Sequence, residues 1–100
     1  MTQAIFKDQL VVELASVLAG PSVGMFLAEC GARVIKVENI HTKGDVTRSW
    51  KLPEEDIDTD ISAYFTSVNW GKESIGLDLK RKEAREVLYR LVAKADMVLS

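Results

Sequence analysis

The spacing of hydrophobic residues changes twice in the first part of the chain. Residues 10–14 form a short apolar run typical of a buried strand, and residues 33–38 alternate apolar with charged side chains as a second strand would. Between them, the apolar residues of 21–30 recur at helical spacing. Pro21 suits the opening of a helix, and Gly31 suits a left-handed helix end. Two strands joined by one helix predict a βαβ unit, with parallel strands and a right-handed crossover.

The second half of the chain repeats this alternation. Residues 61–68 follow a helical pattern with Asp60 as the expected N-cap, and residues 74–79 alternate as a strand. The helix that follows has the clearest amphipathic pattern in the chain, because its apolar residues share one face. These residues are Ala84, Val87, Leu88, Leu91, Val92 and Ala95. A strand at 97–99 would complete a second βαβ unit.

Together these elements predict an α/β fold with an open, mostly parallel sheet and helices on both faces. The strand at 97–99 would normally lead into another loop and helix, because both faces of a parallel sheet need cover. We therefore expect the chain to be the beginning of a longer protein, with the sheet incomplete.

A long connection at 39–60 shows no sustained periodicity, and long ordered loops often serve a function. Within it, Asp45 precedes Arg48 by three residues, which places the two for a local ion pair, and Trp50 is large enough to anchor the loop on the core. The plainer interpretation is a solvated loop held down by one aromatic residue. His41 has no cysteine or second histidine nearby, so no metal site is predicted.

The composition fits one small folded domain. The chain has 100 residues, of which 47% are hydrophobic and 28% charged. A net charge of −2 and a pI near 5.4 argue against a nucleic-acid partner. The single Cys30 excludes an internal disulfide and favours a cytoplasmic protein. No leader peptide and no apolar run of about 18 residues is present, so no contact with a membrane is predicted.

Ligands of open parallel sheets bind beyond the carboxyl ends of the strands, where residues 16–20, the segment from Asn39 onward and residues 78–82 are expected to converge. The last of these places Lys80, Arg81 and Lys82 at a helix start, where each cation costs roughly 0.3–1 kcal/mol. A bound polyanion such as a phosphate would remove this conflict.

The alternative is that water screens these three cations while Asp78 and Glu83 neutralise them. A nicotinamide-dinucleotide site is a weaker hypothesis. Glu38 stands where a ribose-binding acid would stand, but the turn at 19–24 lacks the G-x-G-x-x-G spacing, and Pro21 removes an N–H that a pyrophosphate would use.

No catalytic group is predicted within the chain. Ser16 has no histidine or aspartate at motif spacing, and Cys30 lies on the apolar side of its helix.

Five segments together resemble the N-terminal part of the family III coenzyme A transferases. They are VVELASVLAGP (11–21), GARVIKVE (31–38), GDVTR (44–48), YFTSVNWGKESIGLDLK (64–80) and LVAKADMV (91–98). The family includes formyl-CoA transferase, carnitine CoA-transferase and the 2-methylacyl-CoA racemases. The resemblance implies that residues 1–100 are the N-terminal, CoA-binding, Rossmann-like segment of a longer cytoplasmic enzyme. That enzyme would act as an interlaced homodimer on an acyl-CoA and a carboxylic acid, without a metal.

The resemblance also implies where the chemistry lies. The family's nucleophile, an aspartate that forms a mixed anhydride and then a CoA thioester, would lie beyond residue 100. Its CoA contacts fall here on Leu18, Ala19, Asn39, Leu77, Asp78, Leu79 and Lys80. Formyl-CoA transferase has glutamine in place of Leu18 and arginine in place of Asn39, so specificity for formate or oxalate is not expected.

Two rival functions stay open at this point. A 2-methylacyl-CoA racemase would share the fold but use a downstream acid and base instead of an aspartate nucleophile. A non-catalytic nucleotide-binding or structural domain would lack that aspartate altogether.

Overall fold

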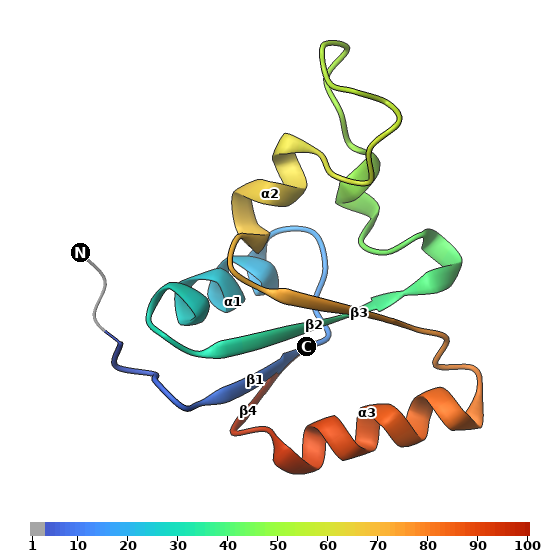
Figure 1. The fold of residues 1–100 in the computed structure, drawn as a ribbon. Helices are drawn as coiled ribbons and strands as arrows, with labels where there is room; N and C mark the ends of the chain where they lie inside the picture. The colour runs from blue at the N-terminus through green and yellow to red at the C-terminus, as the bar shows by residue number, and fades with distance from the viewer. Residues whose placement is uncertain (1–3) are drawn as a thin grey trace.

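The computed structural model describes residues 4–100 and contains a four-stranded sheet whose strands are all parallel (Figure 1). The spatial order of the strands is β3-β2-β1-β4. Their bounds are Leu10–Glu13 (β1), Arg33–Asn39 (β2), Glu73–Leu77 (β3) and Met97–Leu99 (β4). The helices are Ala19–Glu29 (α1), Ala63–Asn69 (α2) and Lys82–Lys94 (α3), with 3-10 turns at Ile40–Thr42 (η1) and Val46–Ser49 (η2). The predicted α/β class is confirmed.

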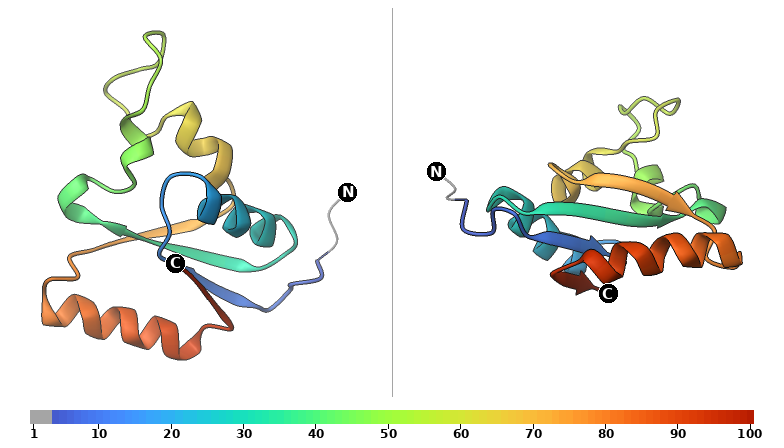
Figure 2. Two further views of the ribbon diagram at one scale, coloured as in Figure 1. Left: turned by 180° about the vertical axis from the view of Figure 1, so that it is seen from behind. Right: turned by 60° about the horizontal axis from the view of Figure 1, so that its bottom comes forward.

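Helices cover both faces of the sheet, as expected. α1 and α2 lie on one face and α3 lies on the other (Figures 1 and 2). The first βαβ unit joins the neighbouring strands β1 and β2 through α1. The second joins the two edge strands, so α3 crosses beneath β2 and β1 on its way from β3 to β4.

The two layers of the core differ in tightness. Under α1, the buried residues Val11, Leu27, Ala32 and Val34 form one cluster. On the other face, α3 packs more loosely, because Val87 and Val92 on its apolar side keep 38% and 37% of their surface exposed. The amphipathic pattern therefore locates α3 correctly but overstates its burial.

Two predicted helix starts are wrong. α1 begins at Ala19, so Pro21 is its third residue, and its N-cap Leu18 makes no side-chain capping bond. α2 is capped by Ser62, whose Oγ accepts a hydrogen bond from the Phe65 N–H at 2.9 Å, and not by Asp60. The Ser62 hydroxyl also donates to the Thr47 carbonyl, which fixes the cap against η2. Gly31 has a φ of +101°, as its predicted role at the end of α1 requires.

Residues 33–38 form a strand as predicted, but two of their three charged positions are not solvated. Lys36 and Glu38 are only 1% and 6% exposed. They share a face with Val34, which packs in the core under α1. The buried charges are paired with side chains from other elements, and those pairs shape the site described below.

The long connection at 39–60 is ordered by η1 and η2. The local ion pair predicted between Asp45 and Arg48 is wrong. Asp45 contacts Lys36 at 3.0 Å, and Arg48 contacts Glu38 at 2.7 Å. Partners on β2 are favoured because each pair neutralises a charge that the fold buries. The Trp50 ring contacts the Tyr64 ring of α2 edge-to-face, with ring centroids 5.2 Å apart, and keeps 47% of its surface exposed. The segment after Trp50 projects from the body of the fold (Figure 1).

Candidate functional site

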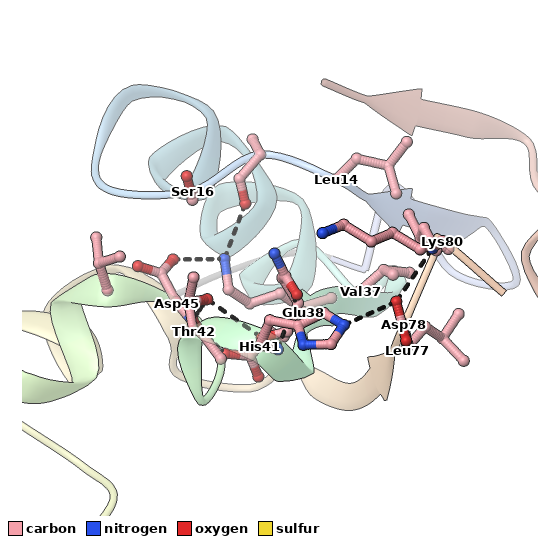
Figure 3. A pocket seen from close by; sticks show the side chains of 16 residues that line it. Leu14, Ser16, Val37, Glu38, His41, Thr42, Asp45, Leu77, Asp78 and Lys80 are labelled. Carbon is pink, nitrogen blue, oxygen red and sulfur yellow. Dashed lines mark hydrogen bonds and ion pairs between the residues drawn. The ribbon is translucent and has the colours of Figure 1, made fainter. Parts of the chain in front are cut away.

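A cavity of about 550 Å³ lies at the carboxyl ends of the strands (Figure 3). Its walls come from the turn after β1, from β2 with the segment that follows it, and from the turn after β3. The lining residues are Leu14, Ala15, Ser16, Lys36, Val37, Glu38, Asn39, His41, Thr42, Gly44, Asp45, Val46, Leu77, Asp78, Leu79 and Lys80. The structure thus brings together three segments that topology placed at one rim of the sheet.

The structure divides the seven residues singled out from sequence into two groups. Asn39 and residues 77–80 line the cavity. Leu18 and Ala19 do not; they form the start of α1, where Leu18 is 49% exposed. The chain leaves the cavity wall after Ser16, at Val17, which has a φ of +73°.

Lys80 is the cation of the 80–82 group that faces the cavity. Its amine points into the cavity in Figure 3, and within residues 4–100 it makes no ion pair. Arg81 contacts Glu83 at 3.6 Å at the surface, and Asp78 contacts His41. Glu83 therefore pairs with one of the three cations, Arg81, as the alternative expected, whereas Asp78 pairs with His41 and Lys80 presents its charge to the cavity.

His41 and Asp78 join two walls of the cavity. His41 Nε2 lies 3.0 Å from Asp78 Oδ1, which connects η1 to the turn after β3. Burial raises the pKa of Asp78, but the contact with His41 and a hydrogen bond from the Lys80 N–H outweigh it and hold the pKa below its ordinary value. Asn39 stabilises the same wall, because its side chain accepts a hydrogen bond from the His41 N–H at 2.9 Å.

A buried ionic cluster consists of Glu13, Lys36, Asp45 and Lys72, of which Lys36 and Asp45 line the cavity. Lys36 Nζ lies 2.9 Å from Glu13 and 3.0 Å from Asp45, and it donates to the Ala15 carbonyl. Lys72 Nζ lies 2.7 Å from the other oxygen of Glu13. Every one of these side chains is at most 3% exposed. Burial lowers the pKa of Lys72, and Glu13 opposes the shift only in part.

Glu38 is bonded on both carboxylate oxygens. It accepts hydrogen bonds from Arg48 (2.7 and 2.8 Å), the Asp45 N–H (2.7 Å) and the Ser74 hydroxyl. Burial raises its pKa, yet these donors together lower it to about 2. Since internal donors occupy the carboxylate, it is not presented to a ribose, which further weakens the nicotinamide-dinucleotide hypothesis.

Residues 6–100 match the model of CoA-transferase family III. The chain belongs to this family. No helix in residues 4–100 is long and apolar enough to cross a membrane.

Similar proteins agree with the family assignment. A succinate–glutarate CoA-transferase of Agrobacterium fabrum is 48% identical over 92 residues, covering 89% of this chain and 23% of that protein. A succinyl-CoA:mesaconate CoA-transferase of Haloarcula hispanica is 45% identical over 93 residues, covering 92% and 23%. A CAIB/BAIF family protein from Brucella suis, solved by crystallography, has a TM-score of 0.85 and 45% identity, covering 98% of this chain and 25% of that one. This family III chain thus spans about a quarter of the length of these relatives.

Several cavity residues of this family III chain carry no sequence signal that sets them apart. His41 and Thr42 stand in a segment without periodicity, and Lys36 looks like any charged position of a half-exposed strand. Topology placed the segment from Asn39 onward at the ligand rim without distinguishing His41 or Thr42 within it, and Lys36 lies inside β2, ahead of that segment.

Proposed function

We propose that this chain is the CoA-binding N-terminal part of a transferase that moves CoA between carboxylic acids through an aspartyl nucleophile beyond residue 100. Family membership and the CoA-transferases among its relatives support the general chemistry. The observation that carries the role of this segment is the rim cavity with the Lys80 amine inside it. A cavity of this size suits part of a large ligand such as CoA.

Each of the seven residues then has a physical role. The Lys80 ammonium pairs with a CoA phosphate, and the Asn39 amide offers a hydrogen bond beside it. Leu77 and Leu79 contribute apolar contacts to CoA. Asp78, which lies between them in the sequence, orients His41 of the neighbouring wall. Leu18 and Ala19, outside the cavity, offer backbone N–H groups at the uncapped start of α1 to a more distant part of the ligand.

The remaining features of the proposed enzyme come from the resemblance. The full-length protein takes an acyl-CoA and a free carboxylic acid as substrates, needs no metal, and acts in the cytoplasm as an interlaced homodimer.

Trapping with hydroxylamine tests the proposed reaction. The full-length protein is mixed with succinyl-CoA, a first probe suggested by the substrates in the names of two relatives, and then with hydroxylamine. An aspartyl anhydride or thioester would be cleaved to an aspartyl hydroxamate, detectable by mass spectrometry of the digested protein. Deuterium uptake at Cα of a 2-methylacyl-CoA without any hydroxamate would instead indicate a racemase, and the absence of both would support a non-catalytic domain.

Substituting Lys80 with alanine is expected to weaken CoA binding about tenfold, the effect of losing one phosphate contact of roughly 1.4 kcal/mol. Isothermal titration of the full-length protein with CoA measures this directly. Lys82→Ala is the matched control, because Lys82 is exposed in the first turn of α3 and does not line the cavity. Equal affinity of the Lys80→Ala variant and the control would remove Lys80 from the site.

A further inference from the structure

Val17 has an unusual backbone conformation. Its φ of +73° lies in the left-handed region, which a β-branched side chain strongly disfavours. The residue is half-buried and stands between Ser16, which lines the cavity, and Leu18, the N-cap of α1. A strained residue persists only where its surroundings hold it, and such residues concentrate at functional sites.

Asp45 supplies a contact that holds this turn. The Val17 N–H donates to Asp45 Oδ2 at 3.3 Å, and the same oxygen lies 3.0 Å from the Lys36 ammonium. The other oxygen, Oδ1, accepts from the Thr47 N–H at 3.0 Å and from the Thr47 hydroxyl at 2.8 Å. Asp45 is only 5% exposed, so neighbours on several sides fix the direction of its carboxylate.

The Asp45 carboxylate therefore connects two walls of the cavity. Asp45 belongs to the wall that follows β2, and Val17 directly follows the wall formed by residues 14–16. The φ of Val17 also sets the direction in which the chain enters α1, and with it the direction of the Leu18 and Ala19 N–H groups. One buried carboxylate thus lies in one wall and bonds to the residue that follows the other.

We propose that Asp45 is a positioning residue for CoA: it holds Val17 in the left-handed conformation and so aligns the turn after β1 with the cavity. This inference rests on the proposed function, because CoA is the ligand that the aligned turn would contact. Asp45 itself need not take part in the chemistry.

The test uses Asp45→Asn and a rescue at Val17 in the full-length protein. In Asp45→Asn, the amide oxygen can keep the bonds from Thr47, and the amide NH₂ then faces Val17, which loses its acceptor. We expect the dissociation constant of CoA to rise about tenfold. Val17→Gly added to Asp45→Asn should bring affinity back to within about threefold of wild type, because glycine adopts a positive φ without steric cost.

The thermal stability of the double variant shows whether Asp45 positions the turn or only stabilises the fold. The double variant should remain less stable to heat than wild type, because Lys36 has still lost a buried carboxylate partner. If the double variant binds CoA with recovered affinity but is still less stable than wild type, the proposal is supported. If the double variant folds but its CoA affinity does not recover, the proposal is overturned. Thr47→Val is the matched control: it removes the hydroxyl contact on the other side of Asp45, leaves the Val17 bond in place, and should keep CoA affinity.

Two further measurements decide the outcome if Asp45→Asn does not fold or if CoA does not bind. Val17→Gly alone should keep CoA affinity within about threefold, since glycine adopts a positive φ without steric cost; a larger fall in affinity would overturn the proposal. The Val17 amide should exchange its hydrogen slowly in wild type and in Thr47→Val, and quickly in Asp45→Asn. If the Val17 amide exchanges slowly in wild type but CoA does not bind, the proposed function is contradicted. The hydrogen bond from Val17 to Asp45 would still be supported in that case.

Discussion

Replacing Lys36 with methionine is expected to lower the free energy of unfolding by about 3–5 kcal/mol. The substitution keeps the length and apolar stem of the side chain but removes the ammonium that lies between Glu13 and Asp45. The side chains of both acids are fully buried, so water cannot solvate either carboxylate once the ammonium is removed. Glu13 keeps Lys72, while Asp45 keeps only neutral hydrogen-bond donors. Urea denaturation of the full-length protein, followed by a probe in this domain, measures the loss.

Arg33→Met is the matched control for this prediction. Arg33 lies on the same strand and pairs with Glu73 at 2.6 Å, but the two side chains are 64% and 58% exposed. Water replaces this pair at little cost, so the loss should stay below about 1 kcal/mol. Equal losses for Lys36→Met and Arg33→Met would mean that the buried cluster contributes nothing beyond an exposed ion pair.

The order of strands and helices could be predicted because it depends on local periodicity, which the sequence states directly. The same pattern misleads at Lys36 and Glu38. Alternation tells which residues share a face of the strand, but it does not tell which face is covered. The partners that make burial tolerable are Glu13, Asp45, Arg48 and Lys72, all distant in sequence or in a loop without periodicity. Only the assembled fold shows that their charges meet.

The candidate site was predictable to the extent that a local conflict or the topology marked it. Lys80 stood out because a cation at a helix start is unfavourable without an anion, and Asn39 because it opens the segment after the strand predicted at 33–38. The position of Leu18 outside the cavity depends on the left-handed conformation of Val17, and valine carries no signal for such a turn. A sequence reading that assigns ordinary backbone angles cannot find this change of direction.

Replacing Arg48 with methionine is expected to lower the free energy of unfolding at pH 7 by about 2–4 kcal/mol, because Glu38 would stay buried without its charged partner. Methionine keeps an apolar stem against the Phe65 ring, which the Arg48 guanidinium covers at 4.0 Å. The effect therefore reports mainly the lost charge. In Glu38→Gln/Arg48→Met, no unpaired buried charge remains, so part of the loss should be recovered.

The pH dependence gives this prediction a second, independent readout. Glu38 has a pKa of about 2 in the folded protein against an ordinary value of 4.5, so the stability it contributes is present above pH 4.5 and is lost as the pH falls toward 2. In wild type this group adds a slope of at most about 1.4 kcal/mol per pH unit across that window. Without the Arg48 donors, burial raises the pKa of Glu38 again, and the slope in that window should shrink. Urea titrations between pH 2 and 5 would contradict this account if wild type and Arg48→Met gave the same slope, since the pKa of Glu38 would then not depend on Arg48.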